Sequence, residues 1–443
     1  MAQSLFERLY KMSEADVVTA QLEGGERAAL RWANNTVTAN LIESDHLLHL
    51  AVRFGAREAQ FSTNRLDDDS LRATLAAAER TARLKPENPE LLPPLQPPQE
   101  YPAVAAYFEE TAAFGPRERA RAVRQSVEIC ARRNLVGAGY LPRFDGYRAF
   151  GNSKGVFGFY RYTGVNFVLT VRTRDGAGSG YARDNGIRRA SELNFAELTE
   201  RACGKAEMSR KPQPLEPGEY AVIMEPVAAA RYLSLLLGAL DARAADEGRS
   251  FFSHKERGQN LLGQKLLGEN ITLRSDPRNA TLLASPIGSE GLPVEETTWI
   301  ERGVLKNLAY SRYWAARQKR RPTGFPATVV WEGGQAGVEE MVGNTRRGLL
   351  ISDFWYIRPV DPIKILYTGL TRNGLFLVEN GKIAAAVNNF RWNDSPAVTL
   401  NHVTMLGRPQ RAMLYETFED EGTALVPAFR AEKFTMSSVS PAT

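Results

Sequence analysis

Apolar and polar residues alternate along several short runs in the first half of the chain. The runs LRW, TVTANLI and HLLHLAVRF within residues 27–84 show the period of two expected of β-strands, and Gly, Asn or Asp bounds each of them. The next segment, SLRATLAAAERTARL, has apolar residues at helical spacing and follows Asp67–Asp69, which are typical capping and first-turn acids. This order predicts strands followed by a helix.

The same order recurs in residues 147–209. Strand-like runs extend from YRAFGNSKGV to GYARDNG, and LNFAELTERACGKAEMSR supplies a helical pattern after them. WANNTV and AFGNSKGV occupy the same place in each copy, at a turn where Asn and Gly tolerate the left-handed backbone of a hairpin. The glycines of GNSKG and DGAGSG are interpreted as hairpin turns as well, because they lack the strand-to-helix setting of a phosphate loop. The first half of the chain is therefore predicted to contain an internal repeat.

Proline-rich segments separate these units from each other and from the second half. Residues 84–102 are too rich in proline for a helix or a central strand and are predicted to be an extended connector. A second boundary lies at residues 211–220. Beyond it, strand patterns dominate residues 268–313 and 347–407, and residues 226–245 form the one convincing helical interruption.

These patterns predict an α+β protein of two domains. Residues 1–213 form an N-terminal α/β domain with two repeated strand–helix units, and residues 214–443 form a C-terminal β-rich, barrel-like domain. The composition, 43% hydrophobic and 24% charged over 443 residues, is that of a globular protein with a sizeable core.

No segment of the chain predicts membrane association. The N-terminus carries several charges and lacks the apolar run of a signal peptide, and the apolar stretch 227–240 is shorter than a membrane span and contains Arg231. Cys130 and Cys203 are isolated and are predicted to be free thiols, which fits a cytoplasmic location.

The net charge of +5 makes the chain mildly basic. One cluster of basic residues stands out, RQKRR at 317–321. This cluster could neutralise phosphates, but no nucleic-acid-binding motif accompanies it. A solvated loop is favoured over a loop that binds an anionic partner, so nucleic acid is not an expected ligand.

The four histidines do not predict a metal site. His46 and His49 flank a strand at odd spacing and therefore point to opposite faces, while His254 lies in a polar turn and His402 opens a strand. The sequence also has no C-x-x-C or H-x-x-x-H pattern. A zinc site built from protein ligands is not expected.

Several phrases together resemble a known family. They follow one another across nearly the whole chain: LRWANNTV, GNSKGV, the helix after residue 225, GENITLRSDP, GSEGLPVEETTWIERGVLKNLAYSRYWA, DPIKILYTGLTRNGLFLVENGKI and HVTMLGRP. Together they are similar to the TldD/PmbA family, also called modulators of DNA gyrase. The EG-x-P…I-x-x-GVLK and G-x-FL-x-ENGKI phrases are the most specific of them.

The resemblance implies a relation to zinc metallopeptidases. TldD-type chains of this family hold zinc with a His-Glu-x-x-x-His helix and a later cysteine, whereas TldE (PmbA)-type chains lack these ligands and pair with TldD. In this sequence the first His position is Met224, the Glu is Glu225, and the second His position is Ala229 or Ala230. The sequence has no cysteine after Cys203. The resemblance therefore implies a metal-free, TldE-like subunit with no cofactor, although zinc is the cofactor of the family.

Glu225 has two interpretations. It is either a vestigial catalytic residue, the former general base beside a zinc-bound water, or a carboxylate that is locally favoured beside Pro226 at a helix N-terminus. The second is preferred. An active hydrolase with unusual ligands, Glu225 with Asp241 or His254, stays an alternative, and no G-x-S-x-G elbow supports a serine enzyme.

The segment WYIRPVDPIKILYTGLTRNG, residues 355–374, is the candidate surface for a peptide or an unfolded polypeptide. Strand-rich domains can bind an extended peptide along a sheet edge, and aromatic and Arg side chains are common anchors. The candidate substrate-binding residues are Trp355, Tyr356, Arg358, Asp361 and Arg372. The alternative is that Trp355 and Tyr356 are core residues.

The leading hypothesis is thus a cytoplasmic TldE-like subunit that takes part in proteolysis of peptides or small proteins with a TldD-like partner. A homodimeric peptide-binding protein without protease activity is the alternative, so the expected assembly is a dimer with a TldD-like chain or with itself. Direct DNA binding rests on the family's older name and on RQKRR alone.

Overall fold

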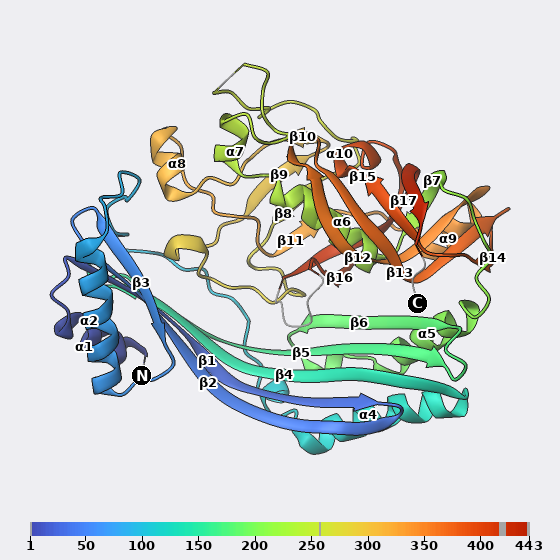
Figure 1. Cartoon of the computed structure of the whole chain (residues 1–443), viewed down its shortest axis with the longest axis horizontal. Helices are drawn as coiled ribbons and strands as arrows, with labels where there is room; N and C mark the ends of the chain where they lie inside the picture. Colours follow the sequence, from blue (N-terminus) through green and yellow to red (C-terminus); the bar gives the residue numbers. More distant parts are fainter. Residues whose placement is uncertain (1, 257, 416–421, 441–443) are drawn as a thin grey trace.

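The computed structural model describes residues 2–256, 258–415 and 422–440. Its first half is built on an antiparallel sheet of six long strands in the order β3-β2-β1-β4-β5-β6 (Figure 1). The strands are β1 (Val17–Ala33), β2 (Thr36–Phe54), β3 (Arg57–Thr63), β4 (Leu135–Asn152), β5 (Phe157–Thr173) and β6 (Ser179–Ile187). The pairing of β1 with β4 joins two three-stranded meanders at the centre of the sheet.

Both halves of this sheet have the same element order: a helix, three strands and a helix. The helices are α1 (Ala2–Met12) and α2 (Asp68–Leu84) in the first half and α4 (Pro116–Arg132) and α5 (Phe195–Met208) in the second, with the short α3 (Glu109–Ala112) before α4. Asp67 caps α2 by accepting from the Ser70 N–H, as its position predicts. Residues 85–102 of the predicted connector form neither helix nor strand, whereas Leu84 is the last residue of α2.

Two details of the first half differ from the sequence-based expectation. TVTANLI and HLLHLAVRF are not separate strands but one strand, β2, which pairs with β1 through the polar stretch between them. Glu43, Ser44 and Asp45 are exposed there, so their polarity marks a solvent-facing part of the strand and not its end. For the same reason His46 and His49 lie inside a strand and do not flank one.

The second half contains an eleven-stranded sheet, part of which closes on itself. β7 (Gly218–Met224) pairs with β12 (Arg347–Asp361) on one side and with β17 (Thr423–Val439) on the other. β13 (Leu366–Glu379) and β15 (Phe390–Asp394) complete the ring between β12 and β17. The barrel-like character expected of this half is therefore present. Further strands are β8 (Leu273–Ser275), β9 (Thr297–Glu301), β10 (Val304–Leu305), β11 (Val329–Trp331), β14 (Lys382–Ala386) and β16 (Val403–Met413).

Residues 268–313 contain less strand than their pattern predicts. Only the short strands β8, β9 and β10 form there, because the loops between them satisfy their backbone groups through turns and isolated bridges. The predicted helix over 226–245 is two helices, α6 (Pro226–Gly238) and α7 (Ala242–Asp246). Short helices also interrupt the later strands: α8 (Arg312–Arg317), α9 (Val338–Gly343) and α10 (Pro396–Thr399).

α6 forms the centre of the largest core. Nine of its residues are buried, and it packs against β12, β16 and β17. Tyr232 of α6 lies among the rings of Phe354, Trp392 and Phe434, and its hydroxyl donates to Asp394 Oδ1 at 2.8 Å. Apart from Arg231 and Ser234, the residues of α6 are predominantly apolar, and a helix of this kind is stable only when it is enclosed.

Cys130 and Cys203 face each other between α4 and α5. Both are buried free thiols, as the sequence predicts, with their sulfur atoms 3.9 Å apart. No helix in the described part of the chain combines the length and the apolar character needed to cross a membrane.

Candidate functional site

The junction between β7 and α6 holds the acidic residue that the sequence singles out. The Glu225 N–H donates to the Ile351 carbonyl at 3.0 Å, and the Glu225 carbonyl accepts from the Ala229 N–H at 2.9 Å. Glu225 is therefore the residue at which α6 begins, and Pro226 occupies the first helical position, where its missing N–H costs nothing. The Glu225 side chain does not cap its own helix.

The Glu225 side chain binds Lys205 of α5 instead. Lys205 Nζ lies 2.5 Å from Glu225 Oε2, and the two side chains are only 12% and 18% exposed. Burial opposes ionisation, but the charge and hydrogen bond of Lys205 prevail and hold the pKa of Glu225 below its usual value. Glu225 is thus a carboxylate fixed by a cation and joins the two halves of the chain.

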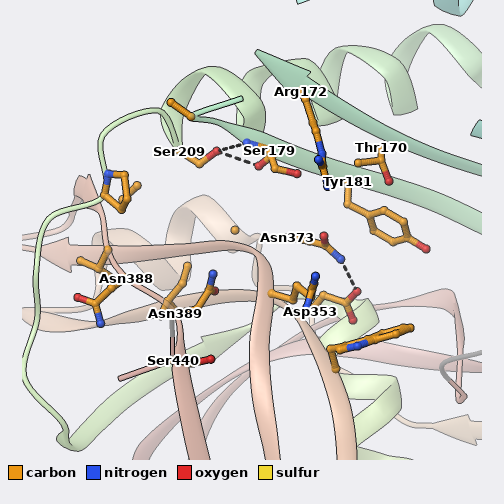
Figure 2. A pocket seen from close by; sticks show the side chains of 18 of the residues that line it. Thr170, Arg172, Ser179, Tyr181, Ser209, Asp353, Asn373, Asn388, Asn389 and Ser440 are labelled. Carbon is orange, nitrogen blue, oxygen red and sulfur yellow. Dashed lines mark hydrogen bonds between the residues drawn. The ribbon is translucent and has the colours of Figure 1, made fainter. Parts of the chain in front are cut away.

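A cavity of about 630 Å³ lies between the six-stranded sheet and the strands β12 and β13 (Figure 2). Strands β5 and β6 provide one wall, with Thr170, Arg172, Ser179 and Tyr181. The opposite wall consists of Asp353, Trp355 and the turn of β13 around Asn373, with Arg231 of α6 behind them. The remaining lining residues come from the turn between β5 and β6 and from the segments near residues 209, 387 and 440.

A buried polar network forms the floor of this cavity. Arg231 Nε lies 2.7 Å from Asp353 Oδ1, and each of these side chains is only 2% exposed. Asn373 Nδ2 donates to Asp353 Oδ2 at 2.9 Å, a contact drawn in Figure 2, and the Phe354 N–H donates to Asp353 Oδ1 at 2.8 Å. Every described partner of the Asp353 carboxylate is therefore a donor.

Burial governs the protonation of the groups at this floor. It raises the pKa of Asp353 although Arg231 and Asn373 oppose the shift, and it raises the pKa of Tyr181. The ordinary pKa of tyrosine, 10.0, already makes Tyr181 a neutral phenol at neutral pH, and burial reinforces this state.

Two family models cover most of the chain. The PmbA/TldA metallopeptidase C-terminal domain matches residues 217–438, and the PmbA/TldA metallopeptidase central domain matches residues 99–210. The chain belongs to the PmbA/TldD family.

Curated relatives of this PmbA/TldD-family chain come from archaea. A metalloprotease of Methanothermobacter thermautotrophicus is 24% identical over 282 residues, which are 58% of this chain and 59% of that protein. An uncharacterized protein of Methanocaldococcus jannaschii is 27% identical over 192 residues, 43% of each chain. The match thus spans less than two thirds of the length of these relatives.

Solved structures share the fold over almost the whole chain. A protein of Thermotoga maritima described as a modulator of DNA gyrase has a TM-score of 0.84 at 17% identity, with 98% of this chain and 100% of that chain covered. TldE of Thermococcus kodakarensis has a TM-score of 0.84 at 20% identity, with 98% and 99% covered. At these identities the likeness concerns the PmbA/TldD-family fold.

The residues at the positions that the sequence resemblance assigns to a zinc motif do not fit a zinc ion. Met224, Ala229 and Ala230 are fully buried in the apolar core around α6, and none offers an imidazole, thiolate or carboxylate. Glu225, the remaining position, is bound to Lys205. Within the described part of the chain, no three His, Cys, Asp or Glu side chains cluster as metal ligands would.

Two of the five candidate substrate-binding residues lie at the cavity. Trp355 and Arg372 both line it, and the guanidinium carbon of Arg372 lies 5.9 Å from the centre of the Trp355 ring. Trp355 is half-buried, so it is neither a core residue nor fully solvated.

The other three candidates lie beyond the cavity wall. Tyr356 is 50% exposed, and Arg358 stacks on its ring at 4.2 Å. Asp361 caps the short turn at Pro362–Lys364, where its Oδ1 accepts from the Ile363 N–H at 2.9 Å. Tyr356 is not a core residue, and Asp361 has a structural role in this turn.

The remaining candidate residues from the sequence form hydrogen bonds or close contacts outside the cavity. Asp241 caps α7 through the Ala244 N–H, and His254 Nδ1 accepts from the Glu256 N–H. His49 Nδ1 contacts Ser62 Oγ at 2.7 Å, and His402 Nδ1 contacts the Val398 carbonyl at 2.9 Å. These contacts give none of the four residues a part in the cavity.

Three arginines of the RQKRR cluster contact other side chains of the same molecule. Arg317 stacks on Trp314, Arg320 lies over the Tyr310 ring, and Arg321 forms an ion pair with Glu295. Among these contacts, only the ion pair with Glu295 offsets a positive charge of the cluster.

Sequence reasoning missed the residues of the cavity floor. Asp353 carries a usable signal, since it is a lone charged residue in the apolar run LLISDFW, and unpaired buried carboxylates are rare. Tyr181 and Arg172 carry no such signal, because they lie on a different sheet and approach the floor only after folding.

Proposed function

We propose that the chain is a metal-free, TldE-like subunit that binds peptide or unfolded polypeptide and takes part in proteolysis with a TldD-like catalytic partner. The observation that carries this proposal is the Lys205–Glu225 ion pair. It engages the acidic residue of the zinc motif at 2.5 Å, while buried Met and Ala side chains occupy the positions of the metal ligands. A general base needs a free carboxylate with a pKa near the working pH, and Glu225 offers neither.

Three observations support this role. The structural likeness includes TldE of Thermococcus kodakarensis over nearly the full length of both chains. The cavity between the two sheets has the size of a small-ligand site, and apolar side chains such as Trp355 and Leu375 line it together with many polar and charged ones. The two free thiols fit a reducing compartment such as the cytoplasm.

The test combines this chain with a separate TldD-like chain that carries an intact His-Glu-x-x-x-His helix. We expect hydrolysis of an unfolded model protein in the mixture but not with this chain alone. Glu225→Gln in this chain should leave the hydrolysis within about twofold, because its carboxylate has no part in the chemistry, whereas the same change in the partner's motif should abolish it.

Metal analysis of the two purified chains provides the second readout. Zinc should accompany the partner and not this chain. About one zinc per chain here, together with hydrolysis that Glu225→Gln abolishes, would overturn the proposal in favour of an active enzyme. Peptide binding without any effect on a TldD-like protease would favour the homodimeric binding protein.

A further inference from the structure

Several half-buried arginines of this protein bind carboxylates. Arg411 binds Asp184 and Glu192, and Arg243 binds Glu90 with two nitrogen atoms at 2.8 and 2.9 Å. The cavity is different. Arg172 and Arg372 both line it, and neither forms an ion pair within the described ranges. Figure 2 shows Arg172 extending from its strand into the space between the sheets.

Arg231 adds a third guanidinium at the floor. Its Nε and Nη2 face Asp353, but its Nη1 is buried without a hydrogen-bond partner among the described residues. Because Nη1 is buried and the other two nitrogens face Asp353, Arg231 contributes its positive charge to the cavity and holds the Asp353 carboxylate in place.

The charges at the cavity do not balance. Its charged lining residues are Arg172, Arg231 and Arg372 against the single carboxylate of Asp353. Asp353 is already engaged by Arg231, Asn373 and a backbone N–H. Two positive charges are left over, and low-dielectric walls strengthen their field in a cleft.

We propose that this cavity binds a carboxylate group of a bound polypeptide, with Arg172 and Arg372 as its charged partners. Guanidinium groups match the geometry of carboxylates and form two parallel hydrogen bonds with them. This inference rests on the proposed function, because a polypeptide is the ligand that brings the carboxylate. The group is either the C-terminal carboxylate or the side chain of Asp or Glu.

The experiment measures binding of three acetylated alanine-rich heptapeptides by calorimetry. One has a free C-terminal carboxylate, one is its C-terminal amide, and one is the amide with a central Glu. Each is titrated into the wild-type chain, the variant Arg172→Gln/Arg372→Gln, and the control Arg121→Gln/Arg124→Gln. The two control arginines are exposed on α4, which lies on the face of the sheet opposite the cavity (Figure 1). Replacing them removes as many positive charges as the cavity variant does.

We expect a carboxylate-bearing peptide to bind at least about tenfold more tightly than the neutral amide, and the cavity variant to lose this preference while the control keeps it. Preference for the first peptide identifies the C-terminus as the source, and preference for the third identifies an acidic side chain. In the wild type, raising the ionic strength from about 0.05 M to about 0.5 M should weaken the preferred peptide more than the amide.

Two results would overturn the inference. They differ in whether the proposed peptide-binding function also fails. If all three peptides bind equally and the cavity variant binds as the wild type does, the carboxylate site is wrong but peptide binding stands. If none of them binds to any of the three proteins, the proposed peptide-binding function fails together with the inference.

Discussion

The Lys205–Glu225 pair shows how one cation changes the meaning of an acidic residue. A glutamate at the start of a helix usually stabilises that helix through its own N–H groups. Here the side chain points to α5, and the ion pair crosses from one half of the chain to the other. The residue type suits the helix terminus, but its partner lies 20 residues away in sequence and on another element.

Lys205→Met should destabilise the fold by about 1–3 kcal/mol, because it leaves the half-buried Glu225 carboxylate without its charged donor. The matched control is Arg201→Met on the same helix. Arg201 pairs with Glu197 at 2.8 Å, but their side chains are 45% and 59% exposed, so the loss should stay within about 0.5 kcal/mol. Urea denaturation of the three proteins gives both values. Equal losses would show that the Lys205 pair is no stronger than a surface pair.

The same ion pair predicts an acid sensitivity. The folded-state pKa of Glu225 lies below its ordinary value of 4.5, so the stabilisation is present above that value and is lost as the pH falls through the folded-state pKa. Wild type should therefore lose stability between neutral pH and this acid range more steeply than Glu225→Gln. Melting temperatures at a series of pH values test this, and parallel curves for the two proteins would contradict it.

The Arg231–Asp353 pair is not explained by stability alone. Both side chains are 2% exposed, and two apolar residues in such a place often stabilise a protein as much or more. Its position at the floor of the cavity gives a reason for its presence.

Arg231→Met alone should cost about 3–5 kcal/mol, because it leaves a buried carboxylate uncompensated. The double variant Arg231→Met/Asp353→Asn should recover part of this loss, since it removes the stranded charge and keeps the size of the side chain. Thermal denaturation of both variants provides the comparison. A double variant less stable than Arg231→Met would contradict the account.

At the scale of elements, the contact between β6 and α5 depends on glycines whose role the sequence conceals. DGAGSG is expected to be a hairpin turn, and only Gly176 sits in one, with a φ of 72°. Gly178 and Gly180 lie against α5 instead. A Cβ at Gly180 would be 2.0 Å from the Ala202 carbonyl oxygen, and one at Gly178 would be 2.1 Å from that of Ala206.

Gly180→Ala should therefore destabilise the protein by about 1–3 kcal/mol, because the helix must move away from the strand. Gly204→Ala on α5 is the control. A Cβ there meets nothing within 4 Å, and replacing a helix-interior glycine should stabilise by about 0.5–1 kcal/mol. Opposite signs in the two denaturation midpoints are expected, and a neutral Gly180→Ala would show that the strand and helix are not in rigid contact.

Periodicity predicted the elements better than their ends. The amphipathic helices α2 and α5 lie where the spacing of apolar residues places them, because each covers one face of the sheet. The length of β2 could not be predicted in the same way. The middle of β2 is polar because its side chains face solvent. Which part of a strand stays exposed depends on how the rest of the chain packs, and the sequence of the strand does not show this.

At the scale of the whole molecule, the site depends on long-range pairing that spacing cannot reveal. β7 and β17 close the ring although about 200 residues separate them, and the cavity combines residues from Thr170 to Ser440. Family phrases in the sequence could predict the fold, because they recur in order along the chain. They could not predict that Arg172 and Asp353 share a cavity, because that follows from how the two sheets pack.

The assembly is the last property that the surface allows us to predict. Tyr356, Val360 and Ile363 are 50%, 55% and 55% exposed within one short stretch of the chain. Large exposed apolar side chains that cluster in this way mark interaction sites, and two-fold pairing is the commonest closed arrangement. We therefore expect a dimer, formed by this chain with itself or with a TldD-like partner, in which this stretch is covered.

Size-exclusion chromatography with light scattering decides the matter for the chain alone and for its mixture with the TldD-like chain. A mass of two chains is expected in at least one of these conditions. Val360→Asp/Ile363→Asp should shift the dimer toward monomers, because it places two charges in an apolar contact. The control Val37→Asp/Ile42→Asp changes side chains that are 50% and 56% exposed on β2 and should leave the mass unchanged. A monomer under both conditions would refute the dimer. A dimer that only the control variant disrupts would place the interface on the six-stranded sheet.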